Sequence, residues 1–116
     1  MIGVDVISIE RIKKMHDKFG EKAYKKFLSD EEILLVKKCE TAAGFWAVKE
    51  AASKALGTGI GKSCSFHDII IKKTKKNAPV LSFSQKVQDS FNLKDAHVSI
   101  AHDMGFAIAI VHLEKY

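Results

Sequence analysis

The chain has 116 residues, of which 47% are hydrophobic and 28% charged, and its formal net charge is +5. This length predicts a single domain, residues 1–116, with a substantial core and no room for an accessory domain. No apolar run approaches the roughly 20 residues of a membrane-spanning helix, and the first residues lack the pattern of a secretory signal. Cys39 and Cys64 have neither CxxC spacing nor a nearby histidine at ligand spacing. We therefore expect a cytoplasmic protein with two free thiols and no membrane partner.

The positive charge is concentrated in residues 11–26. This segment holds seven basic and two acidic residues, whereas the rest of the chain holds twelve of each. A local excess of this kind indicates a docking surface for an acidic partner. The alternative is an ordinary solvated helix face, although such faces usually mix both signs of charge.

One strand followed by several helices is predicted for the first half of the chain. Residues 2–7 form a short apolar strand interrupted by Asp5, whose carboxylate needs a cation, hydrogen-bond donors or a metal if it is buried. The alternative for Asp5 is a strand-edge position open to solvent, or a cap for the next helix. Helical spacing, a Ser29–Glu32 capping box and the glycine after Leu56 delimit the helices. Their expected ranges are 9–19, 23–28, 29–36 and a long helix from 41 or 42 to 56.

Strands dominate the second half of the chain. Three consecutive isoleucines mark the first of them, and a polar turn separates it from its partner. Ser84 begins and Asn92 ends a short helix. The expected strands are 66–71, 80–83, 96–101 and 106–113, the last two joined as a hairpin. Helices early and strands late indicate an α+β fold, with helices packed on a largely antiparallel sheet.

The long helix that ends at Leu56 is apolar around most of its circumference. Its polar residues fall in one narrow arc: Lys49, Glu50, Ser53 and Lys54. Because such a helix lies mostly buried, these groups either sit at its surface edge or line a site. A carboxylate and an ammonium one turn apart, just before a glycine-rich loop, suit metal-assisted phosphate chemistry. The alternative is structural, since Glu50 and Lys54 have the spacing of a helix-stabilising ion pair.

The glycine-rich loop, residues 57–63, is not a P-loop. Leu56 stands where that motif requires its first glycine, and the loop leaves a helix and enters a strand. Its backbone amides, with Lys54 or Lys62, could still bind phosphate. The alternative is a glycine C-cap followed by a flexible turn.

His102 follows a predicted strand at the mouth of the hairpin, where it could hydrogen-bond a phosphate or a hydroxyl. The alternative is a surface histidine with ordinary partners. The other four histidines, His16, His67, His97 and His112, make no recognisable ligand cluster, so no zinc site is expected.

Five short elements occur in one order along the chain. They are Gly3-Val4-Asp5, Arg11, Lys49-Glu50-Ala51 with Lys54, Gly57-Thr58-Gly59-Ile60-Gly61, and Ser99-Ile100-Ala101-His102. Together they resemble the holo-acyl-carrier-protein synthases, the small bacterial type of 4′-phosphopantetheinyl transferase. The resemblance covers essentially the whole chain, and the central helix–loop motif is highly specific.

The resemblance implies transfer of the phosphopantetheine arm of coenzyme A to a serine of acyl carrier protein, with release of adenosine 3′,5′-bisphosphate. By the same resemblance Asp5 and Glu50 bind Mg²⁺, and Lys54 adds positive charge beside the phosphates. These three residues are the expected catalytic group. The base that takes the serine proton stays open between Glu50, a metal-bound water and Lys49. The residues expected to bind coenzyme A are Lys54, Gly57, Thr58, Gly59, Lys62 and His102.

The resemblance also implies two kinds of protein contact. One is with the strongly acidic carrier protein, docked along the first helix by Arg11, Lys14, Met15 and Lys18. The other is with copies of the same chain, because the small members of the family are homotrimers with active sites at subunit interfaces. A monomer of this size would struggle to enclose coenzyme A.

Three departures from the family pattern predict altered contacts to the nucleotide. Gly44-Phe45-Trp46 stands for the usual Gly-Arg-Phe, Ala101 replaces a serine, and Asn77-Ala78-Pro79 replaces an Asn-Gly-Lys-Pro turn. None of them involves Asp5, Glu50 or Lys54.

The rival hypothesis is a small basic nucleic-acid-binding domain, suggested by the isoelectric point near 9.2. It is disfavoured because Phe19, Tyr24 and Phe27 are expected in the core rather than stacked on bases. It also leaves Asp5 and Glu50 unexplained, since carboxylates repel phosphate unless a metal intervenes.

Overall fold

The computed structural model describes the whole chain, from Met1 to Tyr116. The first half contains β1 (Ile2–Ser8), α1 (Ile9–Phe19), α2 (Glu21–Lys25), α3 (Asp30–Leu34) and α4 (Cys39–Leu56). The second half contains a 3₁₀ turn, η1 (Phe66–Asp68), and then β2 (Ile69–Lys73), β3 (Pro79–Phe83), α5 (Gln85–Phe91), β4 (Leu93–Asp103) and β5 (Phe106–Lys115). The predicted α+β class is confirmed, since helices pack on antiparallel sheets.

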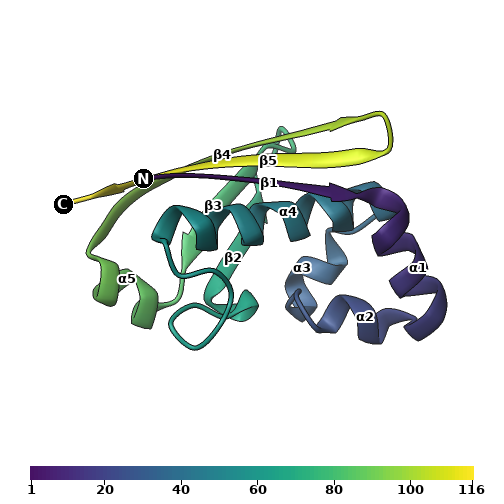
Figure 1. Ribbon diagram of the computed structural model, residues 1–116, viewed down its shortest axis with the longest axis horizontal. Helices are drawn as coiled ribbons and strands as arrows, with labels where there is room; N and C mark the ends of the chain where they lie inside the picture. Colours follow the sequence, from purple (N-terminus) through teal and green to yellow (C-terminus); the bar gives the residue numbers. More distant parts are fainter.

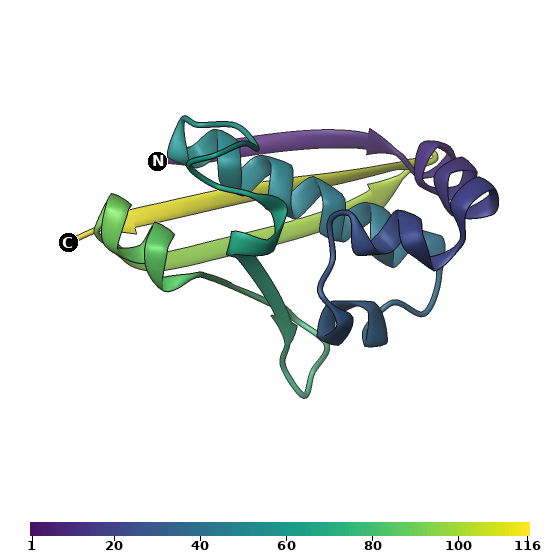
Figure 2. The same ribbon diagram turned by 90° about the horizontal axis from the view of Figure 1, so that it is seen from below.

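Two sheets and one long helix define the architecture. The larger sheet has the strand order β1-β5-β4, and β2 and β3 form a separate antiparallel pair. Figure 1 shows α4 running along one face of the larger sheet, with α1, α2 and α3 gathered at one end and α5 near the other. Seen from below in Figure 2, α4 covers this face while the β2–β3 pair extends away on the β4 side. The site described below is therefore arranged around α4.

The sheet face toward α4 is built from small apolar residues. On β5 the buried positions alternate along the strand: Ala107, Ala109, Val111 and Leu113. The helix contributes its own buried alanines, and small side chains on both elements let helix and sheet approach closely. The opposite face, called here the outer sheet face, exposes large apolar side chains. They are Ile2, Val4, Val6, Phe106 and Ile110.

Four predicted helix ends are confirmed by their capping groups, whereas α2 lies at Glu21–Lys25 instead of 23–28, α3 stops at Leu34 and α4 begins already at Cys39. Ser29 and Glu32 form a reciprocal capping box at the start of α3. Gly57 ends α4 in the left-handed conformation, with φ of 82°, which a residue with a side chain adopts reluctantly. Ser84 begins and Asn92 ends α5, as expected. No helix has the length and apolar composition needed to cross a bilayer.

Two local expectations are wrong. Residues 66–68 are not part of a strand, because the Asp68 carboxylate accepts hydrogen bonds from the backbone and hydroxyl of Ser65 and closes a 3₁₀ turn. The strand starts only at Ile69. Phe19 does not lie in the core either, since 48% of it is exposed. Its ring instead lies beneath the ammonium groups of Lys18 and Lys26.

The last two strands are longer than expected. Strand β4 runs over Leu93–Asp103, and β5 extends to Lys115. Their ladder continues past a register shift between Leu93 and Asp95. The hairpin therefore reaches from one end of the larger sheet to the other, which brings residues far from its turn into cross-strand contact.

Candidate active site

The position of Asp5 depends on a close contact between β1 and α4. A Cβ atom on Gly3 would lie 1.9 Å from the carbonyl oxygen of Ala51 and 2.6 Å from the amide nitrogen of Ala55. Only glycine lets the strand approach the helix backbone this closely. Since side chains two residues apart in a strand share a face, Asp5 points toward the same helix. The Gly-x-Asp spacing therefore places the Asp5 carboxylate beside α4.

Asp5 meets Lys54 there. The Lys54 ammonium donates to Oδ1 of Asp5 at 2.9 Å and to the carbonyl oxygen of Val4 at 3.3 Å. The structural alternative, an ion pair between Glu50 and Lys54 within the helix, is therefore wrong, because Lys54 turns toward the strand instead. The Asp5 side chain is only 11% exposed, and its second oxygen, Oδ2, is buried without a hydrogen-bond partner. A buried carboxylate oxygen with no donor is costly unless something else binds it.

Glu50 is the second carboxylate of this group. It is half-buried, one turn before Lys54 on α4. Burial raises the pKa of Glu50, the neighbouring Asp5 carboxylate raises it further, and Lys54 and Arg11 oppose the shift. Two carboxylates that repel each other, one with a free oxygen, form the oxygen donor set that a hard divalent cation such as Mg²⁺ takes. The structure thus brings together the three residues expected to be catalytic.

Lys49 does not belong to this group. Its side chain is fully buried, and its ammonium lies 2.7 Å from Oε1 of Glu32 and 3.0 Å from the carbonyl oxygen of Phe66. Glu32 also accepts from the amide of Ile71 through Oε2. Burial lowers the pKa of Lys49, while the pairing with Glu32 acts in the opposite direction. This ion pair joins α3, α4 and β2, and it makes Lys49 a residue of the core.

The glycine-rich loop uses its amides within the protein. The amide of Gly57 donates to the Lys54 carbonyl, and those of Thr58 and Gly59 donate to the Ser53 carbonyl. The C-cap alternative is therefore confirmed, and these amides are not free donors for a phosphate. Lys62 is exposed. Contacts of Gly57, Thr58, Gly59 and Lys62 with coenzyme A stay a prediction.

His102 lies in a different place from the Asp5 group. Its Nε2 atom lies 2.8 Å from the Glu40 carbonyl oxygen, and Gly44 of α4 packs directly against the ring. The histidine lines a cavity of about 400 Å³. Other residues of this cavity are Lys38, Thr41, Gly44, Lys73 and Asn77, and neither Asp5, Glu50 nor Lys54 is among them. Within one chain, His102 and the Asp5 group therefore lie in two separate places.

Sequence reasoning missed most of the polar groups in this cavity. Lys38 and Thr41 stand near the start of α4, and Lys73 ends β2, so no motif connects them along the chain. The ammonium of Lys73 donates to the Asn77 carbonyl oxygen at 3.3 Å and lies over the ring of Phe45. Two lysines in one cavity suit an anionic ligand. A signal was present in the departures from the family pattern, because Phe45 and Asn77 both belong to them.

The expected docking residues lie on α1. Arg11, Lys14 and Lys18 are exposed, whereas Met15 is half-buried and packs against the core. The guanidinium of Arg11 lies 5.4 Å from the ring centre of Trp46, which fixes it beside α4. Of these basic side chains, Arg11 lies near enough to the Asp5 group to act on the charge of Glu50.

Comparison with known proteins decides the family. The sequence model of the 4′-phosphopantetheinyl transferase superfamily matches residues 1–111. The chain belongs to the 4′-phosphopantetheinyl transferase superfamily. A holo-[acyl-carrier-protein] synthase of Aliarcobacter butzleri is 60% identical over 111 residues, which are 96% of this chain and 94% of that protein. One from Nautilia profundicola is 59% identical over 115 residues, 99% of this chain and all of that protein.

Solved structures agree with this family. The crystal structure of Helicobacter pylori holo-[acyl-carrier-protein] synthase in complex with coenzyme A superimposes with a TM-score of 0.95 at 50% identity, covering 98% of this chain and 100% of that one. The enzyme from Neisseria meningitidis gives a TM-score of 0.88 at 29% identity, covering 98% and 97%. The predicted family, fold and enzyme class are confirmed: the chain is a phosphopantetheinyl transferase of the holo-[acyl-carrier-protein] synthase type.

Proposed function

We propose that the chain transfers the 4′-phosphopantetheine moiety of coenzyme A to a serine of acyl carrier protein and so converts the carrier from its apo to its holo form. The serine oxygen forms a new bond to phosphorus, the pyrophosphate bond breaks, and adenosine 3′,5′-bisphosphate leaves. The observation that carries the proposal is the Asp5 group, with a partner-free buried carboxylate oxygen beside Glu50 and Lys54. Full-length similarity to named holo-[acyl-carrier-protein] synthases supports it.

Asp5 and Glu50 are the residues that would hold Mg²⁺. Two observations support this assignment: Oδ2 of Asp5 is buried without a hydrogen-bond partner, and the Asp5 carboxylate repels that of Glu50, which contributes to the raised pKa of Glu50. When bound, Mg²⁺ neutralises charge on the pyrophosphate and on the leaving phosphate. Lys54 adds a cation beside the same oxygens, and its exposed ammonium is already held by Asp5.

Among the side chains left open by the sequence, Glu50 is the one that belongs to the Asp5 group, and we propose that it accepts the serine proton. Lys49, the other side chain left open by the sequence, is buried and paired with Glu32. We therefore assign no proton transfer to Lys49.

We further infer that the complete site forms between copies of the chain in a homotrimer. Gly44, beside His102, and Lys54, beside Asp5, are ten residues apart on α4, a separation of roughly 15 Å along the helix axis. The His102 cavity and the Asp5 group, called here the two half-sites, would combine into one site if the cavity of one copy faces the Asp5 group of the next. The outer sheet face supports this arrangement, because its exposed Ile2, Val4 and Val6 form an apolar surface of the kind buried in oligomers.

The acidic carrier protein would dock on α1. The exposed Arg11, Lys14 and Lys18 supply the positive charge, and Arg11 lies close enough to Glu50 to place the carrier serine near the metal site. Met15, the fourth predicted docking residue, is half-buried and packs against the core, so only its exposed part can contact the carrier. Cytoplasmic location is part of the proposal and is supported by the two free thiols, Cys39 and Cys64.

The reaction is tested by the intact mass of apo acyl carrier protein after incubation with this protein, coenzyme A and Mg²⁺. The expected result is a gain of one phosphopantetheine that a chelator prevents. A folded protein that leaves a competent carrier unmodified would contradict the proposal. Salt-sensitive nucleic-acid binding that ignores chelation would favour the rival hypothesis instead.

The shared site is tested by mixing two inactive variants. Glu50→Gln removes one half-site, and Thr41→Trp fills the cavity of the other. After random mixing of subunits, about a quarter of the interfaces would pair two intact halves and recover transfer. A mixture that exchanges subunits and stays inactive would place the whole site within one chain.

A further inference from the structure

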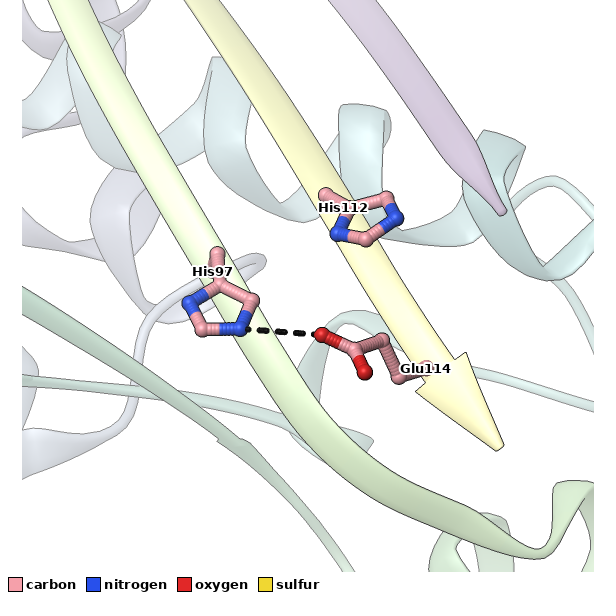
Figure 3. A group of neighbouring side chains, drawn as sticks. All are labelled: His97, His112 and Glu114. Carbon is pink, nitrogen blue, oxygen red and sulfur yellow. Dashed lines mark ion pairs between the residues drawn. The ribbon is translucent and has the colours of Figure 1, made fainter. Parts of the chain in front are cut away.

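Three metal-ligating side chains meet on the outer sheet face, away from the Asp5 group. In the β4–β5 ladder His97 lies directly opposite His112, and Glu114 follows two residues later on the same face of β5. Figure 3 shows the two imidazoles on neighbouring strands, with the Glu114 carboxylate reaching toward His97. The expectation that the histidines form no cluster is therefore wrong, because strand register brings together residues that lie fifteen positions apart.

The spacing of these groups fits a tetrahedral ion. Nε2 of His97 and Oε1 of Glu114 are 3.4 Å apart, and one ligand atom from each of the three residues lies within 4.8 Å of the others. Two ligands held at about 2.0–2.1 Å by one Zn²⁺ in tetrahedral geometry are about 3.3 Å apart. His97 and Glu114 already meet this requirement, whereas His112, whose ring centre lies 6.0 Å from that of His97, must change its side-chain torsions to reach the same ion.

The backbone that carries the two histidines is held in place by strand pairing. Strand β5 is the central strand, so His112 is paired with His97 on one side and with Ile2 of β1 on the other. Only side-chain torsions need to change on binding. A shallow hollow of about 170 Å³ beside the two histidines leaves room for water as a further ligand. Asp95, directly opposite Glu114 in the ladder, adds negative charge near the site.

We propose that His97, His112 and Glu114 bind one divalent transition-metal ion, of which Zn²⁺ is the type. Two imidazole nitrogens and one carboxylate suit Zn²⁺, Ni²⁺ or Cu²⁺, whereas Mg²⁺ prefers oxygen ligands alone. The ion would link β4 to β5 near the end of the sheet. It is separate from the Asp5–Glu50 site, and it lies on the outer sheet face, which the proposed homotrimer would cover in part.

The test is calorimetric titration of the full chain with ZnCl₂ in excess MgCl₂, so that oxygen sites are occupied. We expect one Zn²⁺ per chain, with the affinity reduced at least about 100-fold in His97→Ala and in His112→Ala, since the loss even of outer-shell partners costs about 10–100-fold. His67→Ala is the matched control, because His67 is exposed and stands on η1 outside the cluster. The His67→Ala variant should bind Zn²⁺ with the same affinity as the unaltered protein.

A second measurement locates the ion. The imidazole NMR signals of His97 and His112 should shift on addition of one equivalent of Zn²⁺, in the Glu50→Gln variant as well, while those of His67 stay in place. His97, His112 and His67 are exposed in the single chain, so their replacement should not unfold it. The proposal is overturned if the unaltered protein binds Zn²⁺ no more tightly than the two alanine variants, or if only the signals of other histidines shift.

Discussion

Gly3 and Ala51 are in direct backbone contact, and this contact sets the position of Asp5. Any side chain on Gly3 would overlap the Ala51 carbonyl oxygen, whose distance from a Cβ atom would be 1.9 Å. Because the obstacle is helix backbone rather than a flexible side chain, β1 would have to move away from α4. Asp5, two residues along the strand, would move with it and leave Lys54.

Gly3→Ala should therefore damage both stability and transfer. We expect the free energy of unfolding to fall by about 1–3 kcal/mol, the usual cost of overpacking, and kcat to fall by more than the loss of folded protein explains. Chemical denaturation and a transfer assay on the folded fraction would show this. For stability, Gly61→Ala is the control, since a Cβ there meets nothing within 4 Å. Unchanged kcat in a folded Gly3→Ala protein would contradict the role assigned to this contact.

Charge reversal on α1 should weaken the encounter with carrier protein. Lys14→Glu is expected to raise the apparent KM for the carrier roughly tenfold, about 1.4 kcal/mol, with little change in kcat. Arg11→Glu should raise KM too, but it also alters the surroundings of Glu50, so its kcat is expected to change. Steady-state kinetics with Lys94→Glu, an exposed lysine on β4, as control would separate local from overall charge. An effect mainly on the KM for coenzyme A would argue against docking on this face.

The buried Lys49–Glu32 pair predicts a structural, not a catalytic, phenotype. Lys49→Met leaves the Glu32 carboxylate buried without its cation, which should cost about 3–5 kcal/mol of stability. Adding Glu32→Gln should restore part of this loss, because the charge is removed. Transfer per folded molecule should persist in the double variant. A stable double variant without activity would return Lys49 to the list of candidate bases.

Asp68 should make stability fall in acid. The backbone amide of Ser65 donates a hydrogen bond to Asp68, and this is the main reason why the pKa of Asp68 falls from the ordinary 3.8 to about 2 in the folded protein. Hydrogen bonds from the side chains of Ser65, Ser84 and Lys86 lower the pKa further. Because the folded pKa is depressed, the stabilisation is complete above about pH 4 and is lost as the pH falls toward 2. Asp68→Asn should be about 1–2 kcal/mol less stable at pH 7. Its stability should also decline less steeply between pH 4 and 2 in urea unfolding, and parallel curves for the two proteins would refute the assignment.

Local signals in the sequence predicted most of the helices, strands and caps. Serine caps, Gly57 and alternating apolar residues act through neighbours in the chain, so they can be identified without the fold. The start of β2 was misjudged, because the Ser65–Asp68 contact outweighed the β-propensity of its neighbours. Lys49 was placed in a polar arc, but its partner Glu32 lies seventeen residues earlier on another helix.

Only part of the candidate site could be predicted, because its other contacts join residues that are far apart in the sequence. Asp5, Glu50 and Lys54 were identified through a family resemblance, and the structure brings them together. The pairing of Lys54 with Asp5 instead of Glu50 depends on the approach of β1 to α4, which no spacing along the chain reveals. The separation of His102 from this group and the cluster of His97 with His112 both follow from strand register. Register is set by long-range pairing, so only the fold shows it.

The most direct test of the account is the intact-mass transfer assay on Glu50→Gln, with thermal unfolding measured on the same sample. Burial and Asp5 raise the pKa of Glu50 above its ordinary value of 4.5. Above pH 4.5 the charged carboxylate therefore lowers the stability of the folded protein. A neutral glutamine should leave the stability at pH 7 unchanged or slightly higher. Transfer should nevertheless fall by at least roughly 100-fold, the scale for losing one group that stabilises charge in the transition state. A folded Glu50→Gln protein that modifies the carrier at a near-normal rate, with the same dependence on Mg²⁺, would contradict the proposed metal site.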